Sequence, residues 1–178
     1  MAQRVFFSYH HHADHWRASQ VRNAGVVEGS SPASDHEWDA ITRGGDAAIR
    51  HWIAEQLNNK SCLVVLIGNA TAGRKWITHE IEKAWNDGRG VVGIYIHRLK
   101  DESGNQATKG LSPFDFLTIR TDGRKLSSIV KAYDPPFTSS IHVYDYIKQN
   151  IEAWVEEAVS IRNDYWWRED EPKEAHAS

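Results

Sequence analysis

Two stretches of this sequence are apolar at nearly every position, and they restrict the possible folds more than any other feature. Residues 62–67 read Cys-Leu-Val-Val-Leu-Ile, and residues 90–96 read Gly-Val-Val-Gly-Ile-Tyr-Ile. Neither run alternates apolar with polar residues, so a strand formed from either would be covered on both faces. Such strands are typical of a parallel sheet that lies between two layers of helices.

Segments with helical periodicity separate the strands. Ile49, Ile53 and Leu57 recur every four residues, which indicates an amphipathic helix. The predicted helices are residues 14–23, 46–58, 74–86 and 141–162. The predicted strands are 4–8, 26–27, 61–67, 90–96 and an edge strand within 114–121. Residues 28–34 and 98–112 are predicted loops. The alternation predicts an α/β fold of the flavodoxin-like kind, with a parallel sheet of order 2-1-3-4-5 and helices on both faces.

Length and composition fit one intracellular domain. The chain has 178 residues, and we expect a single domain over residues 1–162, followed by a charged tail over 163–178 that contains Tyr165-Trp166-Trp167. The net charge of -3 and the scattered basic residues favour neither nucleic acid nor a membrane as a partner. The single cysteine, Cys62, excludes a disulfide framework within the chain, so we expect a cytoplasmic protein with a buried, inert thiol.

A ligand site is expected where strand order reverses, beyond the carboxyl ends of the first and third strands. Residues 8–12 and 68–80 would meet there. On a helical wheel with Ile77 at zero, Glu80 falls at about -60°, at the edge of the apolar stripe formed with Ile81 and Ala84. A carboxylate beside apolar groups at such a position is a candidate for catalysis. The wheel equally allows a structural role, in which Glu80 pairs with Arg74 or Lys83 or favours the helix start electrostatically.

Other familiar site patterns find little support. His10, His11 and His12 are adjacent, so they cannot all reach one metal ion from a loop, and no Cys, Asp or Glu pattern completes a metal site. We therefore expect no metal, and read the three as a polar loop at the mouth of the site. Phosphate-binding glycine motifs are missing from the sequence, and Ser8 lacks the surroundings of a hydrolase nucleophile.

Several of these segments together resemble the TIR-like proteins of the bacterial Thoeris anti-phage system. The resemblance spans roughly residues 3 to 155. Its opening strand is Arg4-Val-Phe-Phe-Ser-Tyr-His10, and a Trp precedes the key Glu by four positions, as Trp76 precedes Glu80 here. The other matching segments are residues 35–40, 58–59, 62–68, 74–81, 90–96 and 109–115.

The resemblance implies an enzyme with NAD+ as its substrate and no further cofactor. It would release nicotinamide and make a cyclic ADP-ribose-type signal that activates a separate effector after a phage-derived trigger, with self-assembly as a further possibility. The family's catalytic glutamate corresponds to Glu80. The residues that the resemblance implies for substrate binding are Phe7, Ser8, Tyr9, His10, Trp38, Asp39 and Trp76.

Two alternatives remain open on the sequence. Many TIR domains are non-catalytic interaction or scaffold modules, and a fold does not fix a function. A nucleoside deoxyribosyltransferase-like enzyme would also set a glutamate against a sugar. Nicotinamide release from NAD+ and turnover of deoxynucleosides would separate the three hypotheses.

Overall fold

Five parallel strands form the centre of the protein. The computed structural model describes residues 3–30, 35–120 and 123–169. The strands are β1 (Arg4–Ser8), β2 (Glu28–Ser30), β3 (Cys62–Ile67), β4 (Gly90–Tyr95) and β5 (Ala132–Tyr133), in the order β2-β1-β3-β4-β5. This confirms the predicted fold class and strand order. The reversal of strand order therefore lies between β1 and β3.

Every residue of β3 and of β4 is buried, as their continuous apolar sequences predict. In the register of the central strands, Val64 of β3 aligns with Phe7 of β1 on one side and with Val92 of β4 on the other. Because β1 and β3 are adjacent and parallel, Ser8 at the end of β1 aligns with Val65. The segments that follow both strands thus leave the sheet at the same edge.

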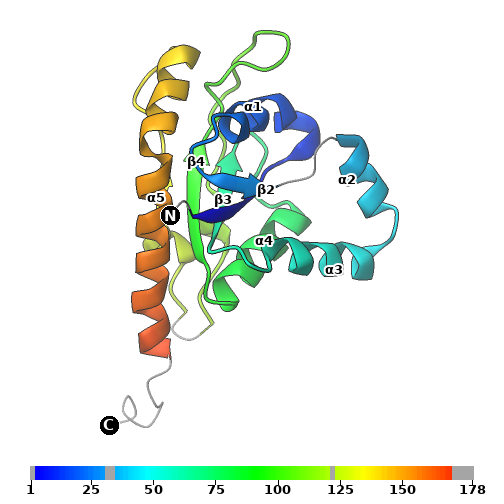
Figure 1. Cartoon of the computed structure of the whole chain (residues 1–178), viewed down its shortest axis with the longest axis vertical. Coiled ribbons are helices and arrows are strands. Elements are labelled where there is room, and N and C mark those ends of the chain that lie inside the picture. The colour runs from blue at the N-terminus through cyan, green and yellow to red at the C-terminus, as the bar shows by residue number, and fades with distance from the viewer. Residues whose placement is uncertain (1–2, 31–34, 121–122, 170–178) are drawn as a thin grey trace.

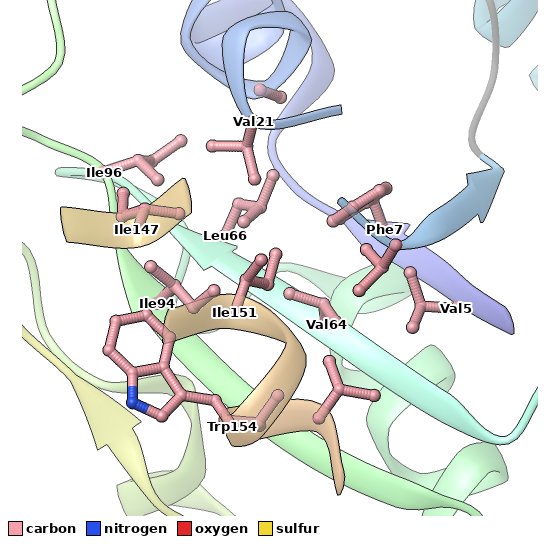
Figure 2. Packing of buried hydrophobic residues seen from close by; sticks show 14 of the residues in the cluster. Val5, Phe7, Val21, Val64, Leu66, Ile94, Ile96, Ile147, Ile151 and Trp154 are labelled. Atoms are coloured by element: carbon pink, nitrogen blue, oxygen red, sulfur yellow. The ribbon is translucent and has the colours of Figure 1, made fainter. Parts of the chain in front are cut away.

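Helices cover both faces of the sheet (Figure 1). They are α1 (His11–Asn23) and α5 (Ser140–Glu169) on one face, and α3 (Asp46–Leu57) and α4 (Lys75–Asn86) on the other, with α2 (Asp35–Thr42) beside α1 and α3. In Figure 2, Phe7, Val64 and Ile94 of the sheet face Ile151 and Trp154 of α5. Successive side chains of a strand point to opposite faces of the sheet. Phe6 and Leu63, which precede Phe7 and Val64, therefore lie on the other face and join the cluster around α3 and α4.

The second strand lies two residues later than predicted. It comprises Glu28–Ser30 instead of residues 26–27, within the segment predicted as a loop. Glycine is common in loops, but the role of Gly29 in this structure is steric, because a Cβ at this position would lie 2.1 Å from the ring of Phe7. The glycine therefore lets β2 pair closely with β1 over a bulky core side chain.

The predicted edge strand within residues 114–121 is wrong. Residues Pro113–Phe116 form the 3-10 helix η1, Leu126–Ser128 form η2, and the edge strand is Ala132–Tyr133, parallel to β4. Phe114 is fully buried over Gly93 of β4, where an added Cβ would approach the Phe114 ring to 2.8 Å. This segment therefore packs on the face of the sheet and cannot pair with its edge.

The last helix continues to Glu169, seven residues beyond its predicted end at Arg162. Tyr165 is buried, with its ring 5.5 Å from that of Trp85 on α4. The Nε of Arg162 donates a hydrogen bond to the carbonyl oxygen of Trp85 at 2.9 Å. The side chains of Trp166 and Trp167 and residues 170–178 of the predicted tail lie outside the described part of the chain. Within the described residues, no helix is long and apolar enough to cross a membrane.

Candidate functional site

A cavity of about 680 Å³ lies at the edge of the sheet where β1 and β3 end. Its walls come from three parts of the chain: the segment 9–12 that leads from β1 into α1, the segment 70–77 with Glu80 on α4, and Trp38 on α2. The predicted meeting of the segments after the first and third strands is therefore present. The volume falls within the range of sites that bind small molecules and cofactors.

Glu80 lies at the inner end of this cavity and is only 4% exposed. Ile77, Ile81 and Ala84 bury the sheet-facing stripe of α4, which holds the neighbouring Glu80 close to the strand ends. Ser8, the last residue of β1, donates a hydrogen bond from Oγ to Oε1 of Glu80 at 3.3 Å. This contact joins two residues 72 positions apart in the sequence.

The environment of Glu80 favours its neutral form. Burial raises the pKa of Glu80 to about 8, and the hydrogen bond from Ser8 offsets part of this rise. The cations considered as its helix partners have other contacts: Arg74 donates to the carbonyl oxygen of Ala70, and Lys83 pairs with Asp87 at 2.8 Å. A positively charged ligand beside Glu80 would favour the carboxylate and lower this pKa.

An aromatic wall faces the β3–α4 segment across the cavity. The ring of His11 stacks on Trp38 with centroids 4.4 Å apart and planes 18° apart, and the Tyr9 ring lies 4.5 Å from His11 on a tilted plane. Trp38 also contacts Trp52 of α3 edge-on, at 5.9 Å. These contacts anchor α2 to α1 and α3. They also give the cavity flat apolar surfaces of the kind on which heteroaromatic rings stack.

Basic side chains stand at the start of α4. Arg74 and Lys75 both line the cavity. Lys75 pairs with Asp46 at 2.6 Å and lies over the ring of Trp76 at 4.9 Å. Together with the positive end of the α4 dipole, these groups favour an anionic part of a ligand at this end of the cavity.

The structure brings most of the predicted site residues together. Glu80, Tyr9, His10, Trp38 and Trp76 line the cavity, and Ser8 reaches it through Glu80. Asp39 lies beside it, 3.1 Å from Nε2 of His12.

Phe7 is placed elsewhere, because its side chain belongs to the buried cluster beneath α1 and α5. Alternation along β1 sends Ser8 and Phe7 to opposite faces of the sheet. A strand that is apolar on both faces gives no sequence signal for choosing between Phe6 and Phe7.

Sequence reasoning missed His11 and Arg74. The three histidines were read as a loop, but His11 and His12 are the first two residues of α1, which begins three residues after β1 ends. A helix that starts so soon after a strand brings its first side chains directly over the strand ends. No group of three metal-ligating side chains occurs among the described residues.

The all-parallel 2-1-3-4-5 sheet, with a buried glutamate at the point where strand order reverses, places this protein in the class of flavodoxin-like α/β domains with a ligand site at that point. The sequence model of the Thoeris protein ThsB TIR-like domain matches residues 6–101, which include every residue that lines the cavity. A protein of Bacillus cereus (strain MSX-D12), named "Putative cyclic ADP-D-ribose synthase ThsB1", is 37% identical over 133 residues, covering 71% of this chain and 69% of the relative. The chain belongs to the Thoeris ThsB family of TIR-like proteins.

Proposed function

We propose that this protein cleaves NAD+ in anti-phage immunity, releasing nicotinamide and producing a cyclic ADP-ribose-type signal that activates a separate effector. The observation that carries the proposal is Glu80, a buried carboxyl group with a raised pKa inside a cavity with aromatic and basic walls. The name of the 37% identical relative, a cyclic ADP-D-ribose synthase, supports the same reaction.

The chemistry needs a carboxylate more than it needs an acid. When the bond between nicotinamide nitrogen and C1′ of the ribose breaks, its electron pair stays on nicotinamide and positive charge develops on the sugar. Glu80 in its ionised form stabilises that charge from a buried position, where electrostatic interactions are stronger than in water. The pyridinium of bound NAD+ lowers the pKa of Glu80 on arrival, so the substrate itself favours the form of the residue that the reaction uses.

Cyclisation requires a second contribution from the cavity. A nucleophile of the same ADP-ribose unit forms a bond to C1′ and loses its proton, so that NAD+ yields nicotinamide, a cyclic product and one proton. This step needs the two ends of the dinucleotide to be held close together. The aromatic wall of Tyr9, His11 and Trp38 would stack one ring, while Arg74 and Lys75 would neutralise the diphosphate.

The partners in this scheme are NAD+, a phage-derived trigger, and an effector reached through the diffusible nucleotide, with self-assembly as a possible part of activation. The decisive experiment adds NAD+ to the purified full chain in the presence of lysate from phage-infected cells and follows nicotinamide by mass spectrometry. We expect release from the wild type and loss of about a thousandfold or more in Glu80→Gln and Glu80→Ala.

The matched control is Glu82→Gln, because Glu82 is exposed on the same helix and points away from the cavity. It should keep the wild-type rate. Undiminished nicotinamide release by both Glu80 variants would refute the proposal. A copurifying protein partner without any NAD+ turnover would favour a scaffold role instead, and turnover of deoxynucleosides would favour a deoxyribosyltransferase-like enzyme.

A further inference from the structure

His11 is a buried residue in the cavity wall, and the proposed reaction uses its ring for stacking but gives no role to its ring nitrogens. It is the first residue of α1, its side chain lines the cavity, and it is only 7% exposed. Its Nδ1 is buried and has no hydrogen-bond partner among the described residues. Buried ring nitrogens in folded proteins are normally paired, so an orphaned one at a ligand cavity calls for an explanation.

The ring of His11 is held in one plane by its neighbours. Trp38 stacks on it at 4.4 Å, and the Tyr9 ring lies at 4.5 Å. Burial lowers the pKa of His11 to about 3, and the charges of His12, His15 and His10 add to the effect. The imidazole is therefore neutral at pH 7, with one nitrogen that donates and one that accepts a hydrogen bond.

A neutral, fixed imidazole suits a particular kind of ligand group. An imidazolium at this position would repel the pyridinium of NAD+, whereas a neutral ring does not. The stacked His11–Trp38 pair offers a flat surface to a heteroaromatic ring, and a ring nitrogen of His11 offers a hydrogen bond to a group at such a ring's edge. Two groups of NAD+ have this chemistry: the carboxamide of nicotinamide and the amino group of adenine.

We propose that His11 is a substrate-binding residue whose Nδ1 accepts a hydrogen bond from the amide N–H or the amino N–H of a planar ring of the dinucleotide. The inference rests on the proposed function, since it takes NAD+ as the ligand. It makes His11 a determinant of which ring substituents the site accepts. A site built to pair with such a group discriminates against analogues that lack it, because its own polar atom is then left unpaired.

The test measures binding of NAD+ to the full chain by calorimetry, in the Glu80→Gln background so that no turnover intervenes. His11→Ala should weaken NAD+ binding about tenfold, the usual worth of one hydrogen bond to a neutral group. His11→Asn should restore most of the affinity, because the Asn amide places a donor and an acceptor near the position of Nδ1. His15→Ala is the control, since His15 lies on the same helix but does not line the cavity.

Two NAD+ analogues distinguish the two rings. If His11 pairs with the carboxamide, His11→Ala should not weaken the binding of nicotinic acid adenine dinucleotide, which lacks the amide N–H. The same substitution should still weaken the binding of nicotinamide hypoxanthine dinucleotide about tenfold, as it does for NAD+. If it pairs with the adenine amino group, the pattern reverses. A purely structural role for His11 would weaken NAD+ and both analogues by the same factor, and that result would overturn the inference, as would unchanged NAD+ binding by His11→Ala.

The outcome also separates this inference from the proposed function. If infected-cell lysate supports NAD+ cleavage by the wild type while His11→Ala binds NAD+ and both analogues like its parent, only the role of His11 fails. If the chain with His11 intact neither binds nor cleaves NAD+, both proposals fail together.

Discussion

At the scale of single residues, burial and the contact with Ser8 act in opposite directions on the protonation state of Glu80. Burial favours neutral Glu80, and the Ser8 hydroxyl stabilises the carboxylate by donating to it. The proposed reaction uses the carboxylate, whereas a pKa of about 8 leaves Glu80 mostly protonated in the free protein at neutral pH. Two measurable consequences follow, one for stability and one for activity.

The first is that Glu80 destabilises the fold as pH rises. Its pKa in the folded protein is about 8 against an ordinary value of 4.5, so between these values the folded chain holds a proton that the unfolded chain releases. Stability therefore falls as pH increases from 4.5 to 8. Glu80→Gln stays neutral, and it should exceed the wild type in free energy of unfolding by about 3–5 kcal/mol at pH 8, with almost no difference at pH 4.5.

Urea unfolding of both proteins across this pH range measures the difference directly, and titrations common to both cancel. Glu82→Gln, at an exposed position on the same helix, is the matched control for the chemical change itself. A stability gap between Glu80→Gln and the wild type that is flat across the range would show that Glu80 titrates normally.

The second consequence concerns Ser8→Ala. Removing the hydroxyl takes away the one hydrogen bond that lowers the pKa of Glu80, so this pKa rises further. The acid limb of the profile of kcat/KM against pH, which reports the free enzyme, should move to higher pH. At pH 7 we expect a loss of about three- to tenfold that shrinks as pH rises. A uniform loss at every pH would assign Ser8 a role unrelated to Glu80.

The sequence located Glu80 but not its surroundings. The apolar spacing of Ile77, Ile81 and Ala84 places Glu80 by local geometry alone. Its pairing with Ser8 depends on the register between β1 and β3, and the orphaned Nδ1 of His11 depends on three elements meeting. Such non-local contacts leave no periodic signal, which is why these features appear only in the structure.

At the scale of elements, two described apolar side chains of α2, Trp38 and Ile41, pack against the cluster around α3 and α4. Trp38 lies between His11 of α1 and Trp52 of α3, and Asp39 of α2 contacts His12 of α1 at an exposed position. Because aromatic contacts of this kind contribute about 0.5–1.5 kcal/mol each, the docking of α2 is weaker than the packing of the central helices. The cavity wall is thus formed by an element that can loosen without unfolding the sheet.

Trp38→Ala tests this arrangement. We expect a loss of about 1–2 kcal/mol in global stability, but a much larger rise in hydrogen exchange over residues 35–42, together with weaker NAD+ binding. Trp38→Phe keeps an aromatic ring and should recover part of the protection from hydrogen exchange and part of the NAD+ affinity. Hydrogen exchange with mass spectrometry measures the protection of α2 and of β3 separately. An equal loss of protection in both would show that α2 unfolds only with the whole domain.

Element boundaries could be predicted where an apolar pattern along the sequence determines them. They could not be predicted where close packing between distant residues does. The helices α3 and α4 and the strands β1, β3 and β4 follow from apolar patterns. The position of β2 depends on the fit of Gly29 against Phe7, and the edge strand depends on Phe114 packing over Gly93. In both cases a glycine makes room for a side chain that is distant in the sequence.

At the scale of the whole molecule, α5 connects the two faces of the domain. Its apolar side covers the cluster of Phe7 and Val64 (Figure 2). Tyr165 in its last turns contacts Trp85 near the end of α4, the helix that carries Glu80. Arg162 is 1% exposed, with its guanidinium 4.4 Å from the centre of the Trp85 ring. The first turns of α4 therefore line the cavity, and its last turn packs against α5.

Shortening the chain tests this connection and the predicted domain end together. A protein ending at residue 169 keeps the Tyr165–Trp85 contact, whereas one ending at residue 162 loses it and exposes the Trp85 ring. Loss of a buried aromatic side chain should lower the free energy of unfolding by about 2 kcal/mol or more between the two, measured by urea denaturation. Glu80 lies on α4 well before Trp85, so the nicotinamide release rate per folded molecule should stay the same. Equal stability of the two shortened chains would instead place the end of the folded domain at residue 162, with the last turns of α5 contributing nothing to it.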